Sequence, residues 1–317
     1  MGESIARSQE IEAFLDRISG LKSPKGNPRT KQIVRRIVSD LFRTIEDFDV
    51  SPAEFWAAVS HLTSAGRERE VALLSPGLGF DHFLDLRMDA ADRAAGVKPG
   101  TPRTIEGPLY VEGAPLVKGE ARLDDGTQDG EILFMSGRVL DVDGKAVPRA
   151  IVEVWHADTR GNYSHFDPTQ SAFNLRRSIE ADAEGRYRFR SIMPSGYGCP
   201  PGGPTERLLT QLGRHGKRPA HIHFFVSAPG YRHLTTQINI AGDPLLHDDF
   251  AFATRDGLIP EVRAQREPGA LAARGIDGPF AEITFDFVLE KPTPGSPATL
   301  VPRERARAQQ PAARPAR

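Results

Sequence analysis

The hydrophobic period of the chain changes near Thr101, and this change constrains the fold more than any other feature. Before it, apolar residues recur at helical spacing, and in Arg29–Phe48 they form one wide apolar stripe. After it, they come in short β-branched or aromatic runs such as Ile132–Leu140 and His221–Ser227, separated by turn signals such as Asp143-Gly144. Many short strands without helical patterns between them favour an antiparallel sandwich or barrel. The sequence therefore predicts an α+β protein whose helices precede an all-β domain.

The change of period and the composition of the C-terminal end divide the chain into three parts. Residues 1–103 are expected to form a helical domain, in which Phe55 and Trp56 lie on the buried face of a helix. Residues 104–290 are expected to form an antiparallel β-sandwich. Residues 291–317 are rich in proline, alanine and arginine, which predicts a disordered tail. A basic arm that binds nucleic acid is the alternative for this tail.

The overall composition argues against several classes of protein. The chain has 317 residues with 41 basic and 42 acidic side chains, so its net charge of −1 creates no global attraction to nucleic acid or anionic membranes. Cys199 is the single cysteine, which excludes an internal disulfide framework and fits a reducing compartment. The sequence shows neither a signal-peptide pattern nor an apolar run of about 18 residues. We expect a cytoplasmic protein that does not insert into membranes or bind nucleic acid.

Two histidines and two tyrosines form the candidate site. His221 and His223 lie two residues apart on an expected strand, so both imidazoles point to one face and can reach one ion. Tyr163 and Tyr197 lie upstream in loops, and neither is on an alternating strand face where a packing tyrosine is expected. A phenol with a pKa of about 10 ionises readily only beside a highly charged cation. If the four residues converge, they form a site that suits ferric iron, because imidazole also binds iron.

Each member of this set also fits a role that involves no metal. A His-x-His pair is more often exposed or hydrogen-bonded than bound to a metal, and a single tyrosine is more often a half-buried core residue. A zinc hydrolase usually needs a third histidine or an acidic ligand. A cupin would place a glutamate four or five residues after the second histidine, where this chain has Ser227 and Ala228. Both competing metal sites are therefore weakened.

Several separated motifs together resemble one enzyme family. They are Thr101–Tyr110, Trp155–Pro168, Gly196-Tyr197-Gly198-Cys199-Pro200-Pro201, Gly213–Gly216, Arg218-Pro219-Ala220-His221-Ile222-His223, Leu234–Ile238 and Gly242-Asp243-Pro244. The chain resembles the intradiol ring-cleavage dioxygenases, and among them the branch that acts on catechol. The helical N-terminal part also resembles this family, so the resemblance extends to about residue 290.

The resemblance implies a reaction and a role for each site residue. It implies one non-haem Fe(III) per subunit, held by Tyr163, Tyr197, His221 and His223. The reaction is cleavage of catechol between its hydroxyls with O2, which gives cis,cis-muconate in the β-ketoadipate pathway of aromatic catabolism. The resemblance further implies that Tyr197 leaves the metal when substrate binds and acts as a base. Arg218 would stabilise charge that develops on the substrate, and Gln237 would help to position the site.

The resemblance also implies a substrate pocket with an apolar wall. Its lining, beside Arg218, would be Leu73, Pro76, Ile105, Pro108, Leu109, Phe250 and Ala251. Such a wall suits an unsubstituted catechol, because it would leave the third hydroxyl of hydroxyquinol without a hydrogen-bond partner. Cleavage of hydroxyquinol or chlorocatechol is the alternative function. A β-sandwich that binds a ligand without catalysis is the alternative from another class.

The partners that the resemblance implies are catechol, O2 and a second copy of the chain. The homodimer would be joined through the N-terminal helices, with a phospholipid bound in an apolar tunnel at that interface. The sequence itself shows only that these helices have wide apolar faces.

Overall fold

The structure is a computed structural model that describes residues 4–307. Contacts divide the chain after Arg67 into two compact units, and each is described by itself. The N-terminal unit contains the 3-10 helix η1 (Ile5–Arg7) and the helices α1 (Gln9–Ile18), α2 (Pro28–Asp47) and α3 (Pro52–Arg67).

The helices α2 and α3 begin at residues that cap them. The Asn27 side chain accepts a hydrogen bond from the Thr30 amide at 3.1 Å, next to a proline at the start of α2. At α3, the Ser51 amide donates to the Glu54 carboxylate at 2.9 Å, and the Glu54 amide donates to Ser51 Oγ at 3.3 Å. This reciprocal pair satisfies amides that the first turn of a helix leaves free.

The apolar faces of these helices remain largely exposed. On α2, Ile37 is 53% and Leu41 55% exposed. Phe55 and Trp56 of α3 are 46% and 63% exposed, so the prediction that they are buried was wrong for the single chain. The physical reason is that so few helices cannot cover every apolar face within their own unit.

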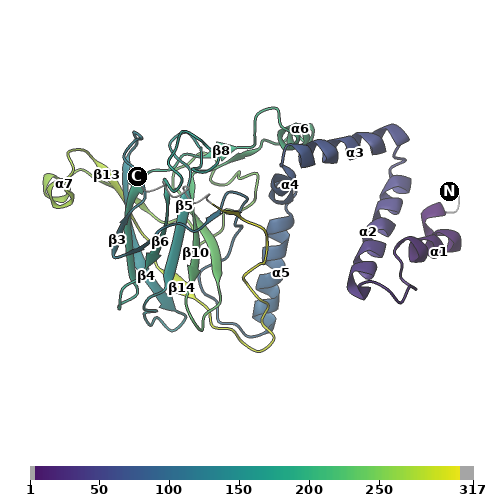
Figure 1. Ribbon diagram of the computed structural model, residues 1–317, viewed down its shortest axis with the longest axis horizontal. Helices are drawn as coiled ribbons and strands as arrows, with labels where there is room; N and C mark the ends of the chain where they lie inside the picture. Colours follow the sequence, from purple (N-terminus) through teal and green to yellow (C-terminus); the bar gives the residue numbers. More distant parts are fainter. Residues whose placement is uncertain (1–3, 308–317) are drawn as a thin grey trace, which may run out of the picture. The chain divides into compact units, whose positions relative to one another are not determined.

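The larger unit begins with two helices and continues as two packed sheets (Figure 1). The helices are α4 (Val71–Gly77) and α5 (Phe80–Ala94). The five-stranded sheet has the order β11 (Leu234–Asn239), β10 (His221–Ser227), β5 (Ile151–His156), β6 (Arg176–Glu180) and β2 (Leu116–Lys118). The six-stranded sheet has the order β12 (Val262–Gln265), β13 (Phe280–Thr284), β4 (Ile132–Asp141), β7 (Arg186–Ile192) and β3 (Glu120–Arg122), and β14 (Phe287–Leu289) also pairs with β4.

Shorter elements complete this unit. Two strand pairs are β1 (Val111–Glu112) with β15 (Ala306–Arg307), and β8 (Tyr197–Gly198) with β9 (Lys217–Arg218). Two further helices are α6 (Pro204–Gln211) and α7 (Pro268–Arg274). Within residues 4–307, none of the helices is both long and apolar enough to cross a membrane.

The alternation of side chains on β10 determines where the candidate site lies. Ile222, Phe224 and Val226 are buried in the core between the two sheets. Because successive side chains of a strand point to opposite faces, His221 and His223 lie on the outer face of the five-stranded sheet. Loops cover this face, since both histidines are only 1% exposed.

The α+β class is confirmed, but the sheets are mixed and the prediction of an antiparallel sandwich was wrong in this respect. β2 pairs with β6, β3 with β7, and both β13 and β14 with β4 in parallel register. Strands joined by a tight hairpin must run antiparallel, whereas a long connection permits either direction. β4 and β13 are separated by well over a hundred residues of chain, so hydrophobic period could not determine their relative direction.

The described part of the C-terminal segment is irregular except for the two-residue strand β15 (Ala306–Arg307). The composition predicted a disordered tail from residue 291, but Ala306 pairs with Val111 in the β1–β15 ladder. Residues 308–317 of the predicted tail lie outside the described residues. The domain limits at residues 103 and 290 stay a prediction.

Candidate metal centre

The four predicted ligands converge on the outer face of the five-stranded sheet. The ring centroids of Tyr163 and Tyr197 are 5.4 Å apart, and those of Tyr197 and His221 are 5.3 Å apart. The two imidazoles have centroids 4.7 Å apart. Tyr163 is 3% exposed and Tyr197 half-buried, so the set is sheltered but reachable on the Tyr197 side.

The two imidazoles present their Nε2 atoms to each other. His221 Nδ1 lies 2.7 Å from the Pro219 carbonyl oxygen, and we therefore assign its proton to Nδ1. His221 Nε2 lies 3.1 Å from His223 Nε2. Burial and the nearby Arg218 charge lower the pKa of His221 to about 3, and burial together with His221 lowers the pKa of His223 well below its usual value. Both rings are neutral and offer lone pairs.

Tyr163 is positioned by a tightly folded loop after β5. The Asp158 carboxylate accepts hydrogen bonds from the Arg160 and Asn162 amides, each at 2.8 Å. The buried Arg176 guanidinium donates to the Ser164 carbonyl at 3.0 Å and lies over the Tyr163 ring at 5.6 Å. These contacts fix the backbone on both sides of Tyr163.

Tyr197 lies in a second loop that approaches the first one closely. The Ser195 amide donates to the Asp158 carbonyl at 3.1 Å, which joins the two loops. At Gly161, which has a φ of +85°, a Cβ atom would lie 2.9 Å from Tyr197 Cβ, so only glycine allows this approach. The backbone of Tyr197 pairs with that of Arg218 in the β8–β9 ladder.

The Tyr163 hydroxyl is an unsatisfied polar group. Its oxygen is buried and has no hydrogen-bond partner among the described residues. Burial, followed by the proximity of Tyr197, raises the pKa of Tyr163 well above its usual value. A buried polar atom without a partner is costly unless something else occupies its direction. A strongly charged cation would meet this need and convert the phenol to a phenolate.

The donor set fits ferric iron better than zinc. Two neutral imidazole nitrogens and two phenol oxygens converge, and two phenolates would neutralise most of the charge of a trivalent ion. His156 is a further buried histidine, but Nδ1 lies 2.7 Å from the Ala157 carbonyl and Nε2 2.7 Å from Ser191 Oγ. Both of its ring nitrogens are occupied, so His156 does not provide the third imidazole of a zinc site.

Arg218 lies beside this donor set. Arg218 is 2% exposed, and its Nη1 is 3.0 Å from His221 Nε2 and 3.5 Å from the Tyr197 hydroxyl. Nη2 donates to the Gln237 side-chain oxygen at 2.9 Å and to the Asp249 carboxylate at 3.0 Å. Burial alone would lower the pKa of Arg218, but Asp249 and Tyr197 raise it above its usual value, so the group stays charged.

Comparison with known proteins gives the family of this chain. Residues 105–291 match the family model "Dioxygenase", and residues 27–96 match "Catechol dioxygenase N terminus". Catechol 1,2-dioxygenase 2 of Acinetobacter lwoffii is 67% identical over 80% of this chain and 93% of that protein. Catechol 1,2-dioxygenase of Acinetobacter baylyi is 55% identical over 96% of this chain and 99% of that protein. The chain belongs to the intradiol ring-cleavage dioxygenases.

A solved structure of a family member supports the same assignment. The structure of catechol 1,2-dioxygenase from Acinetobacter sp. ADP1, inhibited by bound mercury, superposes with a TM-score of 0.93 at 54% identity. The match covers 96% of this dioxygenase and the whole of that chain.

Two residues that contact the candidate site were not predicted from the sequence. Asp249 holds the Arg218 guanidinium with both carboxylate oxygens, and it also accepts the Ala251 amide at 3.0 Å. Trp155 stacks on His223 with a centroid distance of 5.0 Å and an interplanar angle of 5°. In the sequence, Asp249 is visible only as an acidic residue next to the predicted pocket residue Phe250, and Trp155 only as a tryptophan on a predicted strand. The sequence does not show that Asp249 pairs with Arg218, or that Trp155 lies opposite His223 in the β5–β10 register.

The predicted pocket residues of the dioxygenase fall into two neighbouring apolar groups. Leu73 packs against a buried cluster that contains Ile105, Phe250 and Ala251. Leu109 packs against the cluster that contains Tyr163 and Trp155, with Tyr197 at its edge.

The two predicted prolines lie at the edges of these groups. Pro76 is buried in α4, where a Cβ atom at the adjacent Gly77 would lie 3.4 Å from the Phe250 ring. Pro108 follows Gly107, at which a Cβ atom would lie 3.8 Å from His223 Cε1. Pro76 is therefore adjacent to a residue that packs on the predicted pocket residue Phe250, and Pro108 to one that packs on His223. That either proline lines the pocket stays a prediction.

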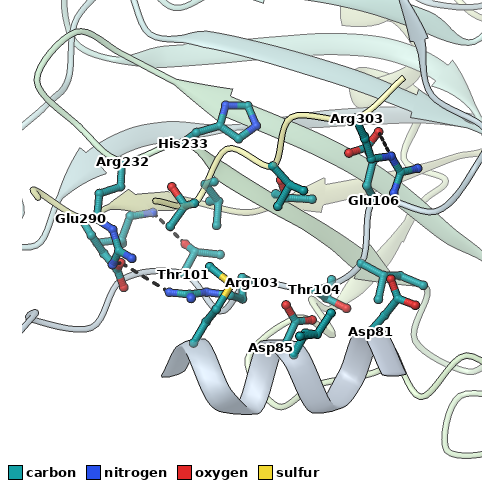
Figure 2. Close-up of a pocket in the computed structure, with 18 residues that line it drawn as sticks. Asp81, Asp85, Thr101, Arg103, Thr104, Glu106, Arg232, His233, Glu290 and Arg303 are labelled. Atoms are coloured by element: carbon teal, nitrogen blue, oxygen red, sulfur yellow. Dashed lines mark hydrogen bonds and ion pairs between the residues drawn. The ribbon is translucent and has the colours of Figure 1, made fainter. Parts of the chain in front are cut away.

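A separate cavity of about 290 Å³ lies between α5 and the β-sandwich (Figure 2). Asp81, Asp85 and Met88 of α5 line one wall, and Ile105 is the predicted pocket residue that lines it. The C-terminal residues Val301 and Arg303 contribute another wall. The cavity therefore touches the loop that also borders the candidate metal centre.

Proposed function

We propose that this protein is a catechol 1,2-dioxygenase that cleaves catechol between its hydroxyls with O2 and gives cis,cis-muconate. One non-haem Fe(III) per subunit would be held by Tyr163, Tyr197, His221 and His223. The observation that supports this most strongly is the convergence of two neutral imidazoles and two phenols, one of which has no other partner among the described residues. The high identity to catechol 1,2-dioxygenases over nearly the whole chain supports the substrate.

Ferric iron at these four residues would supply a template and a Lewis acid for the two oxygens of catechol. The imidazoles of His221 and His223 stay neutral and hold their positions on β10. Tyr163 would be the permanent anionic ligand, because its loop is fixed on both sides. Tyr197 is half-buried on a two-residue strand, and its hydroxyl has one long contact, 3.5 Å to Arg218.

Tyr197 is therefore the residue that we assign as the base for a catechol proton. The permanent charge of Arg218 next to it stabilises negative charge on the substrate oxygens and ring. Asp249 and Gln237 hold the guanidinium in place from the opposite side. Because these groups are buried, their charges act with little screening by water.

The apolar composition of the predicted pocket supports catechol as the substrate rather than hydroxyquinol. Ile105, Phe250 and Ala251 are buried and cannot hydrogen-bond through their side chains to a third hydroxyl. Hydroxyquinol would lose the hydration of that hydroxyl without compensation, which costs about 1–3 kcal/mol. Whether chlorocatechol is cleaved depends on whether the pocket has space for the chlorine atom. Comparison of kcat/KM for catechol, hydroxyquinol and chlorocatechol tests the proposed preference for catechol.

The visible spectrum of the purified protein tests the metal assignment. Phenolate-to-Fe(III) charge transfer should make the protein wine-red, and anaerobic catechol should shift the band. Aerobic catechol should give muconate, seen by its ultraviolet absorption. A colourless protein that contains zinc would contradict the assignment. A protein without any metal, and without activity after iron loading, would instead support a non-catalytic binding module.

We also propose that two copies form a homodimer through their N-terminal helices, with a phospholipid at the interface. The exposed apolar residues of α2 and α3, such as Ile37, Leu41 and Trp56, support this because clustered exposed apolar side chains often mark an interaction surface. Light scattering at micromolar concentration should give twice the mass of one chain. Lipid extraction followed by mass spectrometry should identify the phospholipid.

We also expect the protein to be located in the cytoplasm, and cell fractionation tests this.

A further inference from the structure

The described C-terminal segment, residues 301–307, lies across the loop of residues 104–110 that borders the candidate metal centre. The Arg303 guanidinium donates to the Gly107 carbonyl, and Arg303 lies beside Glu106 at the edge of the cavity (Figure 2). Arg305 forms two hydrogen bonds with the Glu106 carboxylate, from Nε at 3.0 Å and from Nη2 at 3.0 Å. The segment then ends in the β1–β15 ladder.

The Arg305–Glu106 ion pair is largely buried and two-pronged, and ion pairs of this geometry stabilise a fold. Its side chains are 13% and 8% exposed, and the planar guanidinium meets both carboxylate oxygens. Such two-pronged pairs are stronger and more directional than single contacts. The neighbouring Arg307–Glu112 pair is a single contact at 2.8 Å with Arg307 81% exposed, so it should contribute little. Arg307 is therefore a matched control for Arg305.

Two routes connect Arg305 to the predicted ligand His223. The first runs through Glu106 to the adjacent Gly107, whose backbone lies against the His223 ring: a Cβ there would be 3.8 Å from Cε1. The second runs through rings, because the Arg305 guanidinium lies over Tyr110 at 5.8 Å.

This second route is a continuous series of contacts between aromatic rings. Tyr110 packs edge-on against Trp155 at 4.9 Å, and Trp155 stacks flat on His223 at 5.0 Å. Phe225 closes the group, since its ring lies 4.6 Å from that of Tyr110 and 5.5 Å from the Arg305 guanidinium carbon.

We propose that Arg305 is a positioning residue for the catalytic site: it holds the 104–110 loop and the Tyr110–Trp155 stack against His223. The loop contains the predicted pocket residues Ile105, Pro108 and Leu109, so the same contact shapes one wall of the substrate pocket. The catalytic part of this inference rests on the proposed dioxygenase function. The structural part, an ordered Trp155 environment that depends on Arg305, does not.

The variants Arg305→Ala, Arg305→Lys and Arg307→Ala test the proposal in the full chain. Loss of one well-formed charge-assisted pair corresponds to about a ten-fold or larger effect. Arg305→Ala should raise KM for catechol about ten-fold with a smaller change in kcat, while iron stays near one per chain. Arg305→Lys should restore only part of this, because an ammonium cannot form the fork. Arg307→Ala should behave like the parent protein.

Trp155 fluorescence provides a readout that does not depend on activity. The chain has two tryptophans, so a Trp56→Phe background leaves Trp155 as the single reporter. In that background, with and without iron, Arg305→Ala should change the Trp155 emission and Arg307→Ala should not. Unchanged emission in Arg305→Ala overturns the proposal even if the protein cleaves no catechol.

A merely structural role would produce a different combination of results. Arg305→Ala would then lower the melting temperature while KM and Trp155 emission stayed as in the parent protein, and this result also overturns the proposal. Changed emission in a protein that cleaves no catechol would support the link from Arg305 to Trp155 and contradict the proposed function alone. The two failures are therefore distinguishable.

Discussion

The histidine side and the tyrosine side of the candidate metal centre are built in different ways. His221 and His223 belong to a strand in the interior of the five-stranded sheet, between β5 and β11, and each is in contact with further side chains. Tyr163 lies in a loop, and Tyr197 on a strand of two residues. The histidine side also contains the buried Arg218–Asp249 pair, whereas the Tyr163 hydroxyl has no partner among the described residues.

This difference suggests that the two sides have different tasks: one side would hold the metal, and the other would release a ligand. The backbone of a central strand cannot shift without breaking ladder hydrogen bonds, and the two imidazoles are buried against Trp155 and the Pro219 carbonyl, so their positions are fixed before any metal binds. A side chain on a short, half-exposed strand can rotate at little cost. The histidine side is thus suited to fixed ligands, and the Tyr197 end of the tyrosine side to a ligand that leaves when substrate arrives.

The largest expected effect is on the histidine side. His223→Ala removes a preformed ligand and the ring on which Trp155 stacks, so the purified variant should contain almost no iron and no visible band. Metal analysis and the visible spectrum measure this. His247→Ala, which changes an exposed histidine, is the control. Full iron content in the His223 variant would remove this residue from the ligand set.

The next effect compares the two tyrosines. Tyr197→Phe should keep much of its iron but lower kcat about 10²–10⁴-fold, the usual contribution of a positioned base. Tyr163→Phe should lose more iron, because this hydroxyl has no other partner among the described residues. Iron content and single-turnover rates measure the two effects separately. Equal iron loss in both variants would show that the two tyrosines do not differ in how they hold the metal.

A third effect concerns the buried ion pair behind the histidines. Asp249→Asn leaves the Arg218 charge without its carboxylate partner, and breaking a buried pair in this way costs about 3–5 kcal/mol. The free energy of unfolding of the metal-free protein should fall by this amount. Asp248→Asn changes an exposed neighbour and should have little effect. Similar stability of the two variants would contradict the assigned role of Asp249.

The same comparison explains what the sequence could predict. The strand period of two places His221 and His223 on one face, so their pairing follows from spacing alone. Tyr163 comes from a loop and Tyr197 from the two-residue strand β8, and the two meet where Gly161 permits close approach. No period encodes such a meeting. Their assignment depended on the family resemblance. Asp249 was missed because its partnership with Arg218 depends on how its loop folds back onto the sheet.

Two features of the fold were not predictable for a related reason. The parallel pairing of β4 with β13 joins segments far apart in the chain, and local patterns contain no information on their direction. The C-terminal segment has a composition typical of disorder, but composition reflects only the average tendency of a segment to remain in water. Composition does not show that Arg305 meets a particular buried carboxylate on the 104–110 loop.

The smallest expected effect is a pH dependence of stability from His156, which lies in β5 beside the histidine strand. Burial lowers the pKa of His156 to about 4, from an ordinary value near 6.5. Between these values the unfolded chain binds a proton that the folded chain does not, so stability falls as the pH decreases from 6.5 to 4. The loss from this residue is at most about 3 kcal/mol. His156→Gln in the metal-free protein should show a shallower decrease, measured by denaturant unfolding across this range, whereas the exposed control His247→Gln should follow the parent curve. Equal slopes in all three proteins would mean that His156 does not contribute to the acid sensitivity of this dioxygenase.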